Sequence, residues 1–63
     1  MNKDIAQGKW HQLSGSMKEK WGELTHDEIT EMGGKFDKFY GKMQEKYGMS
    51  KEEAQKAFHQ LNS

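Results

Sequence analysis

Residues 19–22 read Glu19-Lys20-Trp21-Gly22, and residues 45–48 read Glu45-Lys46-Tyr47-Gly48. The two segments lie 26 positions apart, and the residues before them repeat at the same offset. This offset pairs Trp10 with Phe36, Leu13 with Phe39, Gly15 with Gly41 and Met17 with Met43. The sequence therefore predicts one unit present twice, at residues 9–32 and 35–61, within a single domain at 1–63, because 63 residues are too few for two cores.

The first part of each unit has the pattern of an amphipathic helix. Apolar residues recur three or four positions apart, which places them on one face of an α-helix, and no segment alternates as a strand does. Gly22 follows the first of these patterns and Gly48 follows the second. We expect both glycines to end their helices, because glycine readily adopts the left-handed conformation found just after a helix.

The second part of each unit begins with the capping-box pattern S/T-x-x-E. In this pattern the hydroxyl group and the carboxylate each accept a hydrogen bond from a backbone N–H that the new helix leaves unpaired. Thr25 and Glu28 form the first box, and Ser50 and Glu53 form the second. The sequence thus predicts an all-α fold of four short helices, of about 13, 8, 13 and 11 residues, arranged as two similar helix-turn-helix hairpins.

The two hairpins must bury their apolar faces against each other, and this requirement predicts the core. We also expect Asp4 to cap a short extra turn that brings Ile5 to the core. The other expected core residues are Trp10, Leu13, Met17, Trp21, Leu24, Ile29, Met32, Phe36, Phe39, Met43, Tyr47, Ala54, Ala57, Phe58 and Leu61.

The composition limits the partners that the chain can have. Ten basic residues, all of them lysine, balance ten acidic ones, and there is no cysteine for a disulfide or a thiolate metal site. Because arginine is the usual anchor for phosphate and guanine, its absence indicates that nucleic-acid binding is absent or weak. No apolar run approaches the roughly 20 residues that span a bilayer, and the first residues lack the apolar segment of a signal peptide. We therefore expect a cytoplasmic protein with no transmembrane segment.

Several motifs accompany the repeat and resemble those of a known family. They are Gly8-Lys9-Trp10, Lys18-Glu19-Lys20-Trp21-Gly22, Leu24-Thr25, Gly34-Lys35 and Gly41-Lys42-Met43-Gln44-Glu45-Lys46-Tyr47-Gly48. Residues 2–57 resemble the CsbD-like family of small bacterial general-stress proteins. The resemblance implies two hairpins packed crosswise in a small bundle, a bacterial source and production under stress, but no reaction and no functional residues. The chain departs from the usual Lys-Gly-Lys of the first helix, where it has Ser14-Gly15-Ser16.

Gly15 and Gly41 stand in the middle of the two long predicted helices, where a glycine costs about 1 kcal/mol relative to alanine. Two explanations are open. The glycines mark a bend or a close approach within the chain, or they leave a smooth face against which a partner or a second copy lies. The starts of the same helices are expected at Gly8 and Gly34.

The second long helix carries a lysine stripe, formed by Lys35, Lys38, Lys42 and Lys46 at three-four spacing. Such a stripe suits phosphates or an anionic membrane surface, and it equally suits a solvated flank whose charge is offset by nearby acids. Tyr40 lies at the edge of the apolar face and is expected to be the most exposed aromatic residue. The predicted interaction surface therefore comprises Lys35, Lys38, Tyr40, Gly41, Lys42 and Lys46.

Groups suited to catalysis or metal binding are scattered along the chain. His11, His26 and His59 are too far apart for a local metal motif and are expected at the surface, and no serine nucleophile motif or phosphate-binding glycine loop is present. We therefore predict no enzyme activity, no cofactor and no metal site. The leading hypothesis is a stress-response protein that acts as a small structural or interaction protein, as a monomer or weak homo-oligomer with an unidentified protein partner. The alternative is a weak anion-binding module that uses the lysine stripe.

Overall fold

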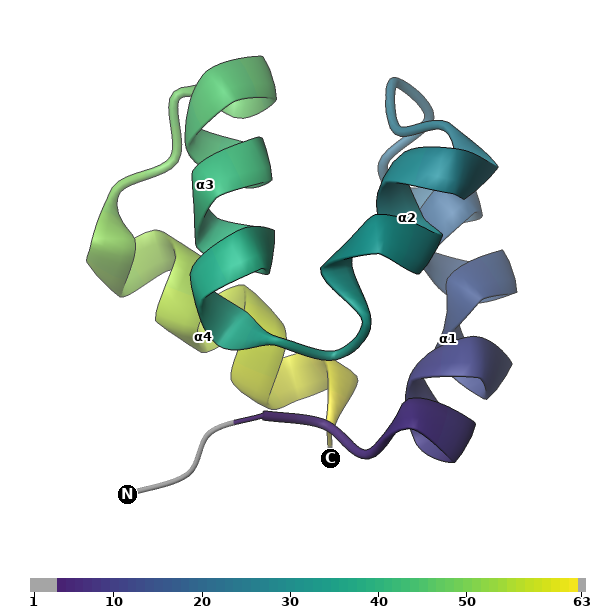
Figure 1. Ribbon diagram of the computed structural model, residues 1–63. Coiled ribbons are helices and arrows are strands. Elements are labelled where there is room, and N and C mark those ends of the chain that lie inside the picture. Colours follow the sequence, from purple (N-terminus) through teal and green to yellow (C-terminus); the bar gives the residue numbers. More distant parts are fainter. Residues whose placement is uncertain (1–3, 63) are drawn as a thin grey trace.

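The computed structural model describes residues 4–62, so residues 1–3 and 63 of the predicted domain lie outside the described part. Four α-helices follow one another, α1 (Gln7–Lys20), α2 (His26–Met32), α3 (Phe36–Tyr47) and α4 (Lys51–Leu61). No strand occurs among the described residues. In Figure 1, α1 and α2 form one side of the molecule, and α4 runs obliquely across α3 on the other side. The predicted all-α fold of two crosswise hairpins is confirmed.

Both short helices begin at their predicted capping boxes. In the first box, the backbone N–H of Glu28 donates to Oγ1 of Thr25 at 3.1 Å, and the N–H of Thr25 donates to Oε1 of Glu28 at 2.9 Å. Ser50 and Glu53 make the same two bonds, at 3.1 Å and 2.9 Å. The four helices contain 14, 7, 12 and 11 residues, close to the predicted lengths.

The two long helices end in different ways. Gly48 adopts the left-handed conformation after α3, with a φ of 62°, as predicted. The first long helix, α1, also ends just before its predicted stop at Gly22, but without a left-handed residue, because Gly22 is not among the glycines with positive φ and the C-cap residue is Trp21, with a φ of −120°. The N–H of Leu24 donates to the carbonyl oxygen of Trp21 at 3.0 Å, and this tight turn needs no left-handed residue.

Residues 4–6 form no helical turn and instead run along the connection between α2 and α3 (Figure 1). The N–H of Ile5 donates to the carbonyl oxygen of Gly34 at 2.7 Å, and Oδ1 of Asp4 accepts a bond from the N–H of Phe36 at 3.1 Å. The expectation that Asp4 caps a turn of its own is therefore wrong, because its carboxylate caps the first turn of α3. Ile5 is buried in the core, as predicted.

Gly34 is required where this segment touches the α2–α3 connection. Its φ is 82°, which side chains other than glycine rarely adopt. A Cβ at this position would also collide with the carbonyl oxygen of Ile5. The segment before α1 and the midpoint of the chain are thus in direct backbone contact.

The core is largely the predicted one. Leu13, Ala57 and Leu61 are partly buried and pack against it, whereas the prediction of a buried Tyr47 is wrong, since 37% of this residue is exposed. The indole N–H of Trp10 donates to the carbonyl oxygen of Ile29 at 2.8 Å, which fixes α1 against α2. The buried apolar residues are Ile5, Trp10, Met17, Trp21, Leu24, Ile29, Met32, Phe36, Phe39, Met43, Ala54 and Phe58.

An aromatic cluster joins the two hairpins inside this core. The ring of Phe58 on α4 has its centroid 6.0 Å from that of Trp10 on α1. It also lies 5.3 Å from the ring of Phe36 and 5.1 Å from that of Phe39. Aromatic rings at these separations attract one another beyond the effect of burial alone. The two hairpins therefore share one core. In addition, α2 of the first hairpin contacts α3 of the second.

Candidate interaction surface on the second long helix

The six predicted surface residues lie on α3 or at its N-cap. Two of the lysines face α2, and within residues 4–62 the other residues do not pair with α2. Lys42 and Lys46 lie toward α2, and each side chain is only 26% exposed. Lys38 and Gly41 are exposed, and Lys35 is the N-cap residue. Part of the charge of the predicted surface is therefore already paired within the chain.

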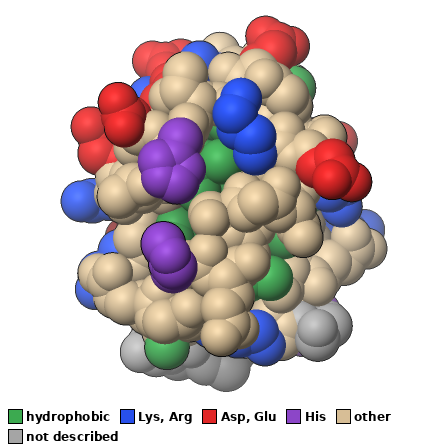
Figure 2. Space-filling view, turned by 90° about the vertical axis from the view of Figure 1, so that its right-hand side faces the viewer, with side chains coloured by type: hydrophobic (Ala, Val, Ile, Leu, Met, Phe, Trp, Pro, Cys, Tyr) green, Lys and Arg blue, Asp and Glu red, His purple; other side chains and the backbone are tan. Residues whose placement is uncertain are grey.

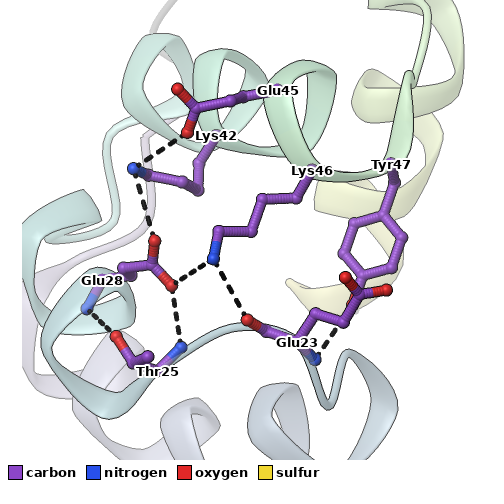
Figure 3. Close-up of polar contacts among 7 residues, drawn as sticks. All are labelled: Glu23, Thr25, Glu28, Lys42, Glu45, Lys46 and Tyr47. Atoms are coloured by element: carbon purple, nitrogen blue, oxygen red, sulfur yellow. Dashed lines mark hydrogen bonds and ion pairs between the residues drawn. The ribbon is translucent and has the colours of Figure 1, made fainter.

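Glu28 is the centre of a network of polar contacts between the two hairpins, which Figure 3 shows. Its Oε1 atom lies 3.0 Å from Nζ of Lys46, and its Oε2 atom lies 3.5 Å from Nζ of Lys42. Lys42 is also 3.4 Å from Oε1 of Glu45, one turn further along α3. The capping carboxylate of α2 thus binds two lysines of α3, and we refer to these contacts as the Glu28 network.

The electrostatics of the Glu28 network follow from these contacts. The hydrogen bond from the backbone of Thr25, followed by that from Lys46, lowers the pKa of Glu28 from its ordinary value of 4.5 to about 2. The pKa of Lys42 is raised, chiefly by Glu45 and to a smaller extent by Glu28. Each group is therefore held in its charged form, which favours the ion pairs at neutral pH.

The C-terminal turn of α3 also holds the turn between α1 and α2. Nζ of Lys46 donates to the carbonyl oxygen of Glu23 at 3.2 Å, and the N–H of Glu23 donates to the hydroxyl oxygen of Tyr47 at 3.2 Å (Figure 3). The backbone carbonyl and N–H groups of Glu23 are thus both bound, by the neighbouring side chains of Lys46 and Tyr47 on α3. This contact explains why Tyr47 lies at the surface rather than in the core.

Two further residues of the predicted surface have structural contacts. Nζ of Lys35 is 3.7 Å from Oδ2 of Asp4, although its side chain is 61% exposed. Tyr40 stacks on Phe36, with ring centroids 6.1 Å apart and ring planes at 6°. Tyr40 is half-buried, so the expectation that it is the most exposed aromatic residue is wrong, because Tyr47 is more exposed.

An open groove of about 410 Å³ lies between α2 and α3. Glu31 on α2 and Lys38 on α3 line it, and neither side chain has an ion pair or a hydrogen bond within the described residues. The residues that line this α2–α3 groove are Glu28, Glu31, Met32, Lys38, Gly41, Lys42 and Glu45. The groove therefore combines an apolar floor at Met32 with acidic and basic walls.

Gly15 and Gly41 are both exposed within their helices. A Cβ at either position would meet no atom within 4 Å, so the explanation that they permit a close approach within the chain is wrong. Gly15 lies on α1. Figure 2 shows the side of the molecule on which α1 lies in Figure 1, and uncharged atoms and histidine side chains cover much of that side. The space at both glycines is open to another molecule.

The described residues form neither a metal site nor a membrane-spanning helix. Over residues 4–62 there is no group of three His, Cys, Asp or Glu side chains that could hold a metal ion, and His11, His26 and His59 are exposed, as predicted. None of the described helices is long and apolar enough to cross a membrane.

Comparison with known proteins identifies the family. The family model described as CsbD-like matches residues 4–56, which include the Glu28 network and every residue that lines the α2–α3 groove. The chain belongs to the CsbD-like family. As a CsbD-like protein, it is 54% identical over 56 residues to the UPF0337 protein YjbJ of Salmonella typhimurium, a match that covers 89% of this chain and 80% of that protein.

Two other relatives of this CsbD-like protein show a similar degree of likeness. The UPF0337 protein YjbJ of Escherichia coli strain K12 is 52% identical over 89% of this chain and 81% of its own length. The UPF0337 protein PA4738 of Pseudomonas aeruginosa is 49% identical over 87% of this chain and 85% of its own length. These names state no activity. No solved structure matches the fold.

The sequence pattern did not reveal the partners of Glu28. The capping box identified Glu28 as a helix-capping residue, but nothing local indicates that Lys42 and Lys46 reach it from the next hairpin. The three-four spacing of these two lysines with Lys38 predicts a single stripe and does not separate the paired lysines from the exposed one. The one available signal was the acid at the start of α2, since an acid held in place by a capping box is a fixed partner for a nearby lysine.

Proposed function

We propose that this CsbD-like chain is a stress-associated bacterial protein of the cytoplasm that acts by binding another macromolecule and does not catalyse a reaction. The observation that carries this proposal is the open space at Gly15 and Gly41. Each glycine costs about 1 kcal/mol in the middle of a helix, and a domain of this size has little stability to lose. Because the fold itself uses neither position, a surface for close contact is the explanation that we favour.

A pull-down from stressed bacterial cells tests this proposal. The wild-type chain is compared with Gly15→Gln and Gly41→Gln, in which a long side chain fills the open space while helix propensity improves. Thr30→Gln is the matched control, because it places the same side chain at an exposed position of α2. We expect a specific partner that the wild type and the control capture and that one of the glycine variants loses.

The outcome that contradicts this proposal is equally clear. If the wild type captures no specific partner from stressed or unstressed cells and also remains a monomer, then binding is not its mode of action. Circular dichroism of each variant shows whether the fold is retained, so that a lost partner is not confused with a lost fold.

Anion binding by the lysine stripe is the second candidate, and the exposure of Lys35 and Lys38 favours it. Against it, Lys42 and Lys46 already neutralise Glu28. The test therefore uses Lys35→Gln with Lys38→Gln, which leaves the Glu28 network intact, and compares it with Lys51→Gln and Lys56→Gln on α4. We expect weaker binding to duplex DNA or anionic vesicles only in the first pair, with affinity that falls as salt rises. Binding that is absent, or unchanged by salt, contradicts this candidate.

A further inference from the structure

On its α3 side, the α2–α3 groove has no side chain at Gly41. The two residues of α3 on either side of it in the groove are Lys38, three positions earlier, and Glu45, four positions later. Residues at this spacing lie on the same face of a helix, one turn apart. The groove therefore presents a positive charge, a gap without a side chain and a negative charge, in that order along α3.

The charges at the two ends of this face remain available. Lys38 has no ion pair within the described chain. Among residues 4–62, Glu45 has one ion pair, with Lys42 at 3.4 Å, and its side chain is 68% exposed, so most of its surface remains open to water. By contrast, Glu28 and Lys42 in the same groove are only 20% and 26% exposed and bind each other. A molecule that enters the groove therefore meets Lys38 and Glu31, which have no ion pair among the described residues, and Glu45, which is largely exposed.

This order of charges along α3 is self-complementary, which means that it matches the same order on a second, antiparallel copy of α3. If a second α3 lies antiparallel to the first, with the two helices crossing at Gly41, then Lys38 of each copy faces Glu45 of the other. A two-fold symmetric contact has this property, because each pair of residues occurs twice. The missing Cβ at Gly41 lets the two helix axes approach at the crossing point, where any larger side chain would hold them apart.

We propose that the α2–α3 groove is a self-association site, in which α3 of one copy packs antiparallel on α3 of a second copy, with the Gly41 residues at the crossing and two Lys38–Glu45 ion pairs beside them. This inference rests on the proposed function, since it names a second copy of the chain as the partner at Gly41. Contacts made by one short polar helix belong to the small, transient class of interfaces, which bury less than about 1,200 Å². The dimer is therefore weak and forms as concentration rises.

Sedimentation equilibrium over a concentration series up to the millimolar range tests the proposal. We expect a reversible monomer–dimer equilibrium for the wild type. Lys38→Glu and Glu45→Lys each place like charges opposite one another twice in the dimer, so each variant alone should dimerise at least about tenfold more weakly. An equimolar mixture of the two variants restores both opposite-charge pairs, and we expect it to form a heterodimer about as well as the wild type dimerises.

The restoration by mixing distinguishes a contact between copies from a contact within one chain, because a loss within one chain persists in the mixture. Gly41→Gln should also abolish the dimer while leaving the thermal stability of the monomer equal or higher, whereas Gly15→Gln on α1 should leave the dimer intact. A wild type that stays monomeric at millimolar concentration overturns the proposal, and so does a dimer that none of the α3 variants weakens. A monomeric wild type that still captures another protein through Gly41 overturns self-association alone and leaves the proposed function standing.

Discussion

The Oε1 atom of Glu28 accepts two bonds at once, from the backbone N–H of Thr25 at 2.9 Å and from Nζ of Lys46 at 3.0 Å. The first bond starts α2, and the second connects α2 to α3 in the other hairpin. A single carboxylate oxygen thus serves both the local structure of one repeat and the packing of the two repeats. Removing its charge should therefore weaken the fold more than removing the charge of an ordinary capping residue.

Glu28→Gln tests this relationship. Glutamine still completes a capping box but has no charge for Lys42 and Lys46, so we expect a lower melting temperature at pH 7. Glu53→Gln in the second box is the matched control, because the ion pairs found at Glu28 do not occur at Glu53 among the described residues, and its loss should be smaller. Equal losses in the two variants would contradict the role of the Glu28 network.

The same carboxylate predicts a dependence on pH. The pKa of Glu28 is about 2 in the folded chain and near 4.5 in the unfolded one, so protonation favours the unfolded state. Its contribution to stability is complete above pH 4.5 and is lost as the pH falls toward 2. We expect the difference in melting temperature between the wild type and Glu28→Gln to shrink over this window, and a difference that stays constant would contradict the assignment.

Gly15→Ala should raise stability. The position is exposed and helical, and a Cβ there meets no atom within 4 Å. Alanine lowers the entropy of the unfolded chain, so we expect the free energy of unfolding in urea to increase by about 0.5–1 kcal/mol. A decrease would mean that the backbone at Gly15 has a requirement that the structure does not show.

Gly34→Ala should have the opposite effect. A side chain at its φ of 82° is strained, and the new Cβ must displace the carbonyl oxygen of Ile5. We expect the free energy of unfolding to fall by at least about 2 kcal/mol, measured by urea denaturation under the same conditions. The two alanine variants thus differ in sign although both replace a glycine, and a neutral Gly34→Ala would contradict the contact between residues 4–6 and the α2–α3 connection.

Ile5 provides a graded test of that contact. Its side chain is 4% exposed, and Ile→Ala changes at such sites typically cost about 2–5 kcal/mol. Because that loss can unfold a domain of this size, Ile5→Val is the second variant, with an expected loss of about 1 kcal/mol. Both losses are measured by urea denaturation. If both variants were as stable as the wild type, this result would contradict the burial of the Ile5 side chain.

Tyr47→Phe removes the hydroxyl group that accepts the N–H of Glu23. We expect a loss of about 0.5–1 kcal/mol in the free energy of unfolding, as is typical of a partly exposed hydrogen bond. Tyr40→Phe is the control, because the contact of its hydroxyl group with Gln44 is long, at 3.5 Å, and should contribute less. A larger loss of unfolding free energy in Tyr40→Phe than in Tyr47→Phe would contradict the role of the bond between Glu23 and Tyr47.

The parts of the fold that depend on neighbours in sequence could be predicted. Both capping boxes lie within four residues, and the apolar stripes follow from the helical period, so the four helices and nearly all of the core were expected. The repeat makes Gly22 equivalent to Gly48 as a helix stop, but the left-handed conformation depends on how each turn is closed, and only Gly48 adopts it. The turn at Gly22 is closed by the hydrogen bond from the N–H of Leu24 to the carbonyl oxygen of Trp21.

The candidate surface was harder to predict, because its residues meet only after the hairpins pack. Lys46 lies on the flank of α3, and nothing near it in the sequence shows that it lies beside Glu28 or Glu23. Tyr47 fits the apolar stripe by position, yet its hydroxyl group has a better partner in the backbone of the turn than the core provides. Residues with both an apolar and a polar part are the ones for which a helical period alone is a weak guide.

The aromatic cluster at Phe58 affects how the chain can fold during its synthesis. A ribosome makes Trp10 early and Phe58 late, and the first hairpin emerges before the ring that covers it exists. Until α4 is made, the rings of Trp10, Phe36 and Phe39 lack the Phe58 ring that packs on them in the folded chain, and exposed apolar surface of this kind is what chaperones and proteases recognise. We therefore expect the two hairpins to fold as one cooperative unit rather than one after the other, because Trp10 of the first hairpin packs on Phe39 and Phe58 of the second.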